Sequence, residues 1–136
     1  MEIKHNDATT KRPEGDRVLD APFVFADIPK FIGILKDEKT WEKNDRNAIT
    51  VFKTEGMTIV LTLLKAGAFI RDNSVNGFLT VQLLEGSIRM ETLERDYKMI
   101  QHQLISFHPE FPHSIEALSD SILLLFTYEL GSHKIL

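Results

Sequence analysis

Short apolar runs, separated by residues that favour turns, alternate along most of the chain. They recur roughly every ten residues, a spacing typical of the strands in β-sandwiches and barrels. In one run Leu79, Val81 and Leu83 alternate with polar residues, so we expect this apolar set to face a barrel interior. The pattern predicts an all-β fold with strands at 48–53, 57–64, 78–84, 87–92, 97–100, 104–107, 113–117 and 122–128.

One segment before these runs carries a helical rather than an alternating pattern. Asp27 is suited to cap the N-terminus of a helix, Pro29 suits the first turn, and we expect the helix to end near Asp37 or Glu38. Its apolar side chains form a stripe, which we expect to cover one end of the barrel or to face a partner. They are Ile28, Phe31, Ile32 and Leu35.

The pattern divides the chain into four segments. Residues 1–16 are polar and charged, with too few apolar side chains to offset the entropy of ordering, so a mobile arm is predicted. Residues 17–47 hold the short helix and an edge strand, because Pro22 cannot donate a hydrogen bond to a sheet. Residues 48–130 are predicted to form the barrel, and residues 131–136 a C-terminal tail.

Composition and charge narrow the function classes. The chain has 136 residues, no cysteine and a formal net charge of −4, with both signs scattered. No thiolate is available as a metal ligand or nucleophile, and no basic stripe is present to neutralise nucleic-acid phosphates. The first residues lack the apolar stretch of a signal peptide, and the longest apolar run, 122–126, is too short to span a bilayer. We therefore expect a soluble, cytoplasmic protein that binds neither nucleic acid nor membrane.

Two stretches of the chain resemble the two conserved motifs of the cupin superfamily. The first motif, G-x5-H-x-H-x3-4-E-x6-G, aligns with Gly67 at its start and Gly86 at its end. The second, P-x-G-x2-H, places its histidine on His113 and its glycine on Glu110. The resemblance covers roughly residues 48–128. It implies a cupin-like β-barrel, that is, a double-stranded β-helix or jelly roll, here with one short N-terminal helix.

The metal-binding positions of these motifs mostly hold other residue types. The two histidine positions of the first motif are occupied by Asn73 and Val75. The glutamate position is occupied by Leu79, and of the four ligands in the family only His113 is present. Valine and leucine have no lone pairs to donate, and one imidazole with one amide is too few ligands for a divalent cation. We therefore expect no metal and no other cofactor.

The same positions line the cavity in cupins, so the resemblance implies a ligand pocket at the barrel mouth. A largely apolar pocket with two polar side chains suits a small organic molecule. The predicted pocket residues are Asn73, Val75, Leu79, Val81, His113 and Ile115.

His113 is the only candidate catalytic residue, because an imidazole can act as a general base near neutral pH. Asp72 is the nearest candidate acid, while Tyr97 and Tyr128 are expected away from both motifs.

Three functions remain open on this evidence. The first is a metal-free protein that binds a small organic molecule in the barrel mouth. The second is a metal-independent enzyme, of isomerase or epimerase type, that uses His113 as general base, although the missing acid and tyrosine partners weigh against it. The third is an assembly domain without a ligand. A homodimer is expected, because cupin-like barrels commonly dimerise and the edge strand in residues 17–25 needs to be covered.

Overall fold

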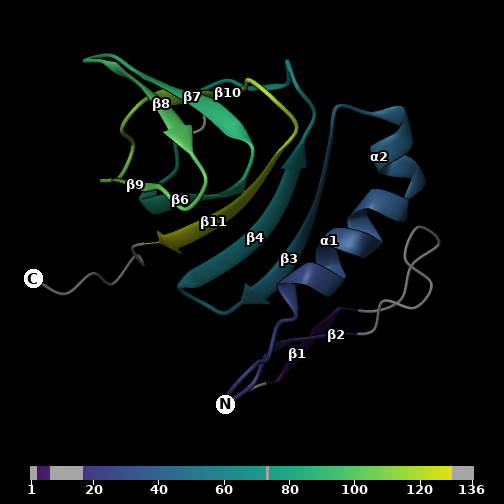
Figure 1. Cartoon of the computed structure of the whole chain (residues 1–136). Helices are drawn as coiled ribbons and strands as arrows, with labels where there is room; N and C mark the ends of the chain where they lie inside the picture. Colours follow the sequence, from purple (N-terminus) through teal and green to yellow (C-terminus); the bar gives the residue numbers. More distant parts are fainter. Residues whose placement is uncertain (1–2, 7–16, 73, 130–136) are drawn as a thin grey trace, which may run out of the picture.

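Two antiparallel sheets face each other and enclose the main hydrophobic core (Figure 1). The computed structural model describes residues 3–6, 17–72 and 74–129. In the larger sheet the spatial order is β3 (Arg46–Lys53), β4 (Met57–Leu64), β11 (Ser121–Glu129), β6 (Gly77–Glu85) and β9 (Leu104–Phe107). In the smaller sheet it is β5 (Phe69–Ile70), β10 (His113–Ala117), β7 (Ser87–Thr92) and β8 (Asp96–Ile100).

The strands agree closely with the sequence pattern. Each of the eight predicted strands is present, and the bounds differ from the predicted ones by no more than two residues. β1 (Lys4–Asn6) and β5 are not predicted, because a strand of two or three residues is too short to show an alternating pattern. The all-β prediction is therefore confirmed.

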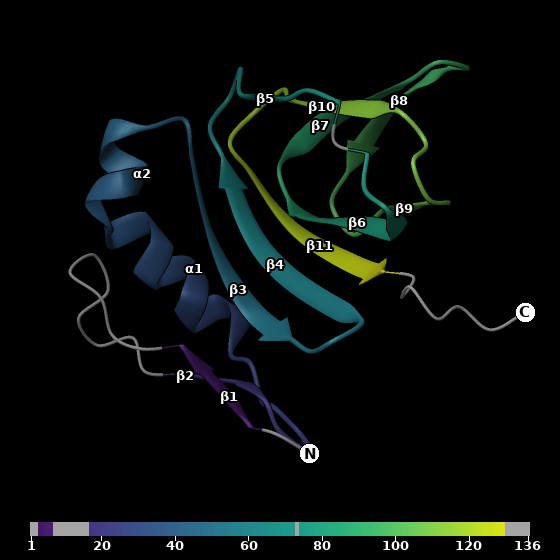
Figure 2. The ribbon, with the colours of Figure 1, turned by 180° about the vertical axis from the view of Figure 1, so that it is seen from behind.

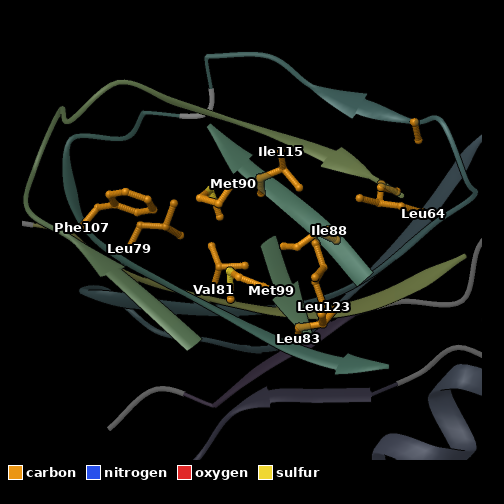
Figure 3. Packing of buried hydrophobic residues seen from close by; sticks show 12 residues of the cluster. Leu64, Leu79, Val81, Leu83, Ile88, Met90, Met99, Phe107, Ile115 and Leu123 are labelled. Carbon is orange, nitrogen blue, oxygen red and sulfur yellow. The ribbon is translucent and has the colours of Figure 1, made fainter. Parts of the chain in front are cut away.

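Side chains from both sheets fill the space between them (Figure 3). Burial alternates along β6, with Leu79, Val81 and Leu83 inside, which confirms the predicted inward face. Burying an aliphatic side chain of this size contributes roughly 1.5–3 kcal/mol, so this set is a main source of stability. The buried members of this barrel cluster are Leu64, Ala68, Leu79, Val81, Leu83, Ile88, Met90, Met99, Phe107, Ile115, Ala117 and Leu123.

The helix α1 (Ile28–Asp37) lies against the outer face of the larger sheet (Figure 2). A second hydrophobic cluster fills the space between them. Asp27 caps this helix as predicted, because its Oδ1 accepts a hydrogen bond from the Lys30 N–H at 3.2 Å. The expectation that the apolar stripe covers one end of the barrel is wrong. The outer face of β3 and β4 is itself apolar, so helix and sheet bury each other. The buried members of this helix cluster are Leu35, Ile49, Val51, Leu61, Leu63 and Ile122.

Asn47 joins the helices to the larger sheet. It is 6% exposed, and its Nδ2 donates hydrogen bonds to the Leu35 carbonyl at 3.0 Å and to Glu38 Oε1 at 2.9 Å. Its Oδ1 accepts from the Ala48 N–H at 3.0 Å. Asn47 thereby gives the Leu35 carbonyl at the end of α1 a second and shorter hydrogen bond, besides the one from the Glu38 N–H at 3.4 Å. A second short helix, α2 (Lys39–Lys43), follows directly and is not predicted by the sequence pattern, which has one helix.

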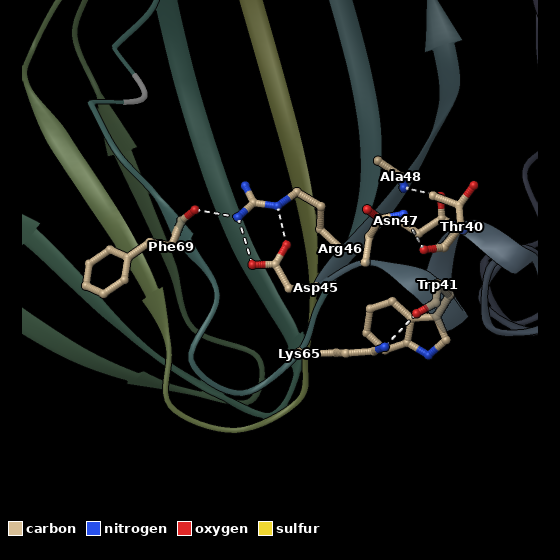
Figure 4. A network of polar contacts seen from close by, with 9 residues as sticks. Thr40, Trp41, Asp45, Arg46, Asn47, Ala48, Lys65 and Phe69 are labelled. Atoms are coloured by element: carbon tan, nitrogen blue, oxygen red, sulfur yellow. Dashed lines mark hydrogen bonds and ion pairs between the residues drawn. The ribbon is translucent and has the colours of Figure 1, made fainter.

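Further polar contacts near the start of β3 involve Arg46 and Lys65 (Figure 4). Arg46 donates to Asp45 Oδ1 at 2.8 Å and to the Phe69 carbonyl at 2.7 Å. The hydrogen bond from Arg46 holds the pKa of the Asp45 carboxyl below its ordinary value, because it favours the charged form. Lys65 Nζ donates to the Trp41 carbonyl at 2.6 Å and lies 4.9 Å from the centre of the indole ring.

The N-terminal strands form a separate two-stranded sheet near β3. β1 pairs with β2 (Arg17–Asp20), and the Arg17 guanidinium donates to the Thr50 carbonyl at 2.6 Å. β2 is shorter than the predicted edge strand. Beyond it Phe23 and Phe25 are each 86% exposed.

The predicted segment boundaries map onto the structure only in part. The barrel begins with β3 at Arg46, within the segment predicted to hold the helix. Most of the predicted arm, residues 1–2 and 7–16, lies outside the described residues, as does the predicted tail. Among the described residues, no helix has the length and apolar character that crossing a bilayer requires.

Candidate functional site

His113 lies at the first position of β10, at the barrel mouth between the two sheets. It pairs with Thr92 of β7, and its side chain is almost fully enclosed, with 4% of the residue exposed. The imidazole stacks on the Phe107 ring, with 4.2 Å between ring centres and an interplanar angle of 6°. Phe107 stacks in turn on Phe111 at 5.9 Å. The mouth is thus built around a stack of three rings, from β9, β10 and the segment between them.

The hydrogen bonds of His113 determine which ring nitrogen is available. Nδ1 lies 3.0 Å from the Phe111 carbonyl oxygen, which can only accept, so Nδ1 carries the hydrogen. In the neutral ring Nε2 is then an acceptor. Nε2 is buried and has no hydrogen-bond partner among the described residues. An unsatisfied buried acceptor costs about 1–3 kcal/mol, so this nitrogen is an unusual feature of the interior.

Three of the predicted pocket residues are fully buried in the barrel. Leu79, Val81 and Ile115 have at most 2% exposure and belong to the barrel cluster. Val75 is half-buried and packs against that cluster. Asn73 lies outside the described residues. Leu79, at the glutamate position of the first motif, is thus part of the packed core. The contact of the predicted pocket residues with a ligand stays a prediction.

A groove opens at the mouth, on the side where β8 and β9 approach each other. Its volume is about 270 Å³, and it includes both Phe107 and Phe111 of the ring stack. The lining residues are Thr92, Glu94, Arg95, Tyr97, Ile105, Ser106, Phe107, His108 and Phe111.

A wider groove of about 560 Å³ continues along the same seam. Tyr97, Ile105 and Ser106 line both grooves. Tyr97, which we expected away from both motifs, thus shares the groove at the mouth with Phe107 and Phe111. The pairing of Thr92 with His113 brings the β7–β8 hairpin to the mouth. Only the pairing of β7 with β10 and β8 places Tyr97 there, and the local sequence pattern does not show which strands pair.

The loop before His113 is held in a strained conformation. Glu110 has a φ of 61°, in the left-handed region that a non-glycine residue adopts at a cost of roughly 1 kcal/mol. Its N–H donates to the Val75 carbonyl at 2.8 Å, which fastens the loop to the segment before β6. The glycine position of the second motif thus keeps the glycine-like backbone although the residue is a glutamate.

The residues at the mouth do not fit a divalent cation. One nitrogen of His113 is occupied by a carbonyl, and His108 packs edge-on against Phe78 with ring centres 5.1 Å apart. Asp72 is exposed, and its backbone N–H donates to Ser114 Oγ at 3.0 Å. Within the described ranges no three histidine, aspartate or glutamate side chains converge. Three or four such donors are the usual requirement, so the donor set matches a hydrogen-bonding site better than a coordination site.

Comparison with known proteins identifies the fold. No protein-family model and no curated protein matches the sequence. Several solved structures match it in three dimensions. A conserved protein of unknown function from Streptococcus pyogenes superposes with a TM-score of 0.61 and 21% identity, covering 68% of this chain and 85% of that one. A cupin superfamily protein from Desulfitobacterium hafniense has a TM-score of 0.61 and 13% identity, over 63% of this chain and 79% of its own.

A third match points the same way. An RmlC-like cupin from Desulfovibrio desulfuricans has a TM-score of 0.56 and 21% identity, over 61% of this chain and 81% of its own. Similarity at these identities concerns architecture alone. Together with the two facing sheets, the placement of His113 and the two partial motifs, it shows that this chain has the fold of the cupin superfamily.

Proposed function

We propose that the protein binds a small organic molecule at the barrel mouth without a metal ion. The observation that carries this proposal is the buried lone pair of His113 Nε2, which has no partner among the described residues. A ligand that donates a hydrogen bond from an O–H or N–H group would satisfy it. The cost of the empty acceptor is thereby recovered on binding.

The surroundings define the rest of the ligand. Phe107 and Phe111 offer ring faces beside the imidazole, and the groove next to them also carries Thr92, Tyr97 and Ser106. Apolar walls with a few hydroxyl groups are typical of sites for small organic molecules. We infer an uncharged ligand with a flat or aromatic part and at least one hydrogen-bond donor.

Binding requires a local movement. Nε2 has essentially no exposed surface, so a ligand reaches it only after some local movement. We infer that the segment from His108 to Pro112 moves, because it carries Phe111 of the ring stack. The left-handed backbone of Glu110 raises the energy of the closed loop and so lowers the cost of that shift.

An enzymatic role for His113 has less support. A general base that is oriented for proton transfer usually has its second nitrogen held by a carboxylate, whereas Nδ1 here meets the Phe111 carbonyl. Asp72, the acid considered from the sequence, has its carboxylate hydrogen-bonded by Ser74 on the exposed surface. A cytoplasmic location stays a prediction.

The test is a fragment screen observed by ligand NMR, with uncharged aromatic alcohols, phenols and amides as probes. For wild type we expect saturation-transfer signals from a subset of these fragments. His113→Phe keeps a ring against Phe107 but removes the acceptor, so we expect at least a tenfold weaker affinity for the fragments that bind wild type.

Two controls separate a site from a general effect on the core. Ile88→Val shortens a fully buried side chain of the same cluster and should leave fragment affinity unchanged. Binding should also survive excess EDTA. Equal affinity of wild type and His113→Phe would overturn the role of Nε2, and loss of binding on chelation would overturn the metal-independent part.

A further inference from the structure

The strand β8 forms an edge of the smaller sheet and, among the described residues, has no hydrogen-bonded strand on its outer side (Figures 1 and 2). Edge strands present N–H and C=O groups that a further strand can pair with. At Ile100 both groups point away from β7. Its N–H donates to Gln103 Oε1 at 3.0 Å, and its carbonyl accepts from the Gln103 N–H at 3.1 Å. Since strand geometry repeats every two residues, the backbone groups of Lys98 and Asp96 also point outward.

The charges on this part of the sheet are arranged unfavourably within one chain. Lys98 lies directly opposite Arg89 of β7, and Asp96 lies directly opposite Glu91. Like charges at directly opposite positions destabilise a sheet. Arg89 is relieved on its other side by Glu116 of β10, whose Oε1 lies 2.7 Å from the guanidinium. Lys98, Asp96 and Glu91 form no ion pair within the described ranges.

A second copy of the same strand corrects this arrangement. We propose that the protein forms a symmetric dimer in which two β8 strands pair antiparallel about a two-fold axis at Tyr97. This register places Asp96 of each copy opposite Lys98 of the other. Both residues direct their backbone groups outward, so the two pairs also exchange backbone hydrogen bonds. Across the interface, Arg89 and Lys98 of one copy are then followed by Asp96 and Glu91 of the other copy. The two cationic residues of one copy thus meet the two anionic residues of the other.

The same register affects the grooves. Tyr97 lies on the barrel side of β8, is 41% exposed and lines both grooves. With the axis at this residue, the two Tyr97 side chains lie opposite each other. The dimer thus adds a tyrosine of the second copy to the wall of each groove. It also covers the outer edge of the seam between β8 and β9.

Charge-reversed variants test the proposal. Lys98→Glu gives an all-acidic edge and Asp96→Lys an all-basic edge, and each removes one like-charge contact inside the monomer, so both variants should fold. Wild type is expected at twice the chain mass of 15.6 kDa in sedimentation velocity at micromolar concentration. Each variant alone should dimerise at least tenfold more weakly, because two attractive contacts become repulsive.

The two variants mixed in equal amounts should form a heterodimer, since each acidic edge then faces a basic one. Lys53→Glu, a matched reversal at the exposed end of β3, should leave the dimer intact. A monomeric wild type, or no heterodimer in the mixture, would overturn the proposal. So would a dimer that resists both β8 variants but is broken by Phe25→Ser, which would assign the contact to the exposed aromatic residues near the N-terminus.

Discussion

The two sheets of this fold differ in how they are covered, although they share one core. The larger sheet has the barrel cluster on its inner face and, over β3 and β4, α1 on its outer face, whereas the smaller sheet has only its inner face covered. The sequence differs accordingly. β11 contains a continuous apolar run from Ile122 to Phe126, while β7 alternates buried and exposed positions. The candidate ligand site and the proposed dimer edge both involve the smaller sheet, where hydrogen-bonding groups and charged side chains reach the surface.

The largest expected effect comes from the doubly covered sheet. Leu61→Ala removes a fully buried side chain between β4 and α1 and should lower the free energy of unfolding by about 2–5 kcal/mol. Leu93→Ala truncates a leucine of the β7–β8 hairpin that is 83% exposed and should change it by no more than about 0.5 kcal/mol. Urea denaturation measures both. If both variants lost the same free energy of unfolding, the larger sheet would not be the more deeply buried of the two.

Next in size is the polar junction under the helix. Asn47→Ala leaves the Leu35 carbonyl without its side-chain donor in a buried position, and we expect a loss of about 1–3 kcal/mol. Hydrogen exchange should accelerate at the C-terminal end of α1 before it does so in β11. Asn44→Ala is the control, because its contact with the Thr40 carbonyl is exposed and should contribute only a few tenths of a kcal/mol. Equal free energies of unfolding for Asn47→Ala and Asn44→Ala would show that the buried hydrogen bonds of Asn47 do not stabilise the fold.

A stabilising change is expected at the mouth. Glu110→Gly relieves the left-handed backbone at φ 61° and should raise the free energy of unfolding by about 1 kcal/mol. Because a more stable closed loop opposes the movement that ligand entry requires, fragment affinity should fall slightly. Glu55→Gly changes an exposed glutamate that does not have a positive φ, and it should stabilise nothing. A destabilised Glu110→Gly would contradict the strained loop.

The smallest effect concerns pH. The pKa of Asp45 is lower in the folded protein than its ordinary value, chiefly through the hydrogen bond from Arg46. The unfolded chain therefore binds this proton first as the pH falls. The contribution of Asp45 to stability is complete above its unfolded pKa, near about 3.9, and is lost as the pH falls through the folded value. Urea midpoints between pH 6 and 2.5 should fall less steeply for Asp45→Asn than for wild type. Identical slopes would contradict the shift.

Local pattern was sufficient for most of the fold. Alternation gave the inward face of β6, and an aspartate followed by a proline located the start of α1. The surface on which the helix packs was not predictable. A stripe of apolar residues indicates that this helix face is buried, but it does not identify the part of the fold that buries it. The second helix was missed, since five residues after a break show no periodicity.

The candidate site divides in the same way. His113 was found from its motif, but the ring stack with Phe107 and the entry of Tyr97 into the mouth depend on strand pairing. Thr92 and His113 lie opposite each other although β8 and β9 separate them in the sequence. Register across such a distance depends on the packing of the whole barrel, which single-sequence patterns do not contain. The alternation predicted that Leu79 and Val81 face inward, but how tightly they pack depends on the facing strands.

The position of β11 has a consequence for how the chain is made. This strand follows every other described strand in the sequence, yet it pairs with both β4 and β6 at the centre of the larger sheet. During translation, β4 and β6 are therefore synthesised long before the strand that joins them, and each has an open edge until then. Nascent chains that stop short of residue 121 should be unable to complete the barrel and should depend on chaperones or degradation. The main sheet can therefore be completed only after β11 has been synthesised.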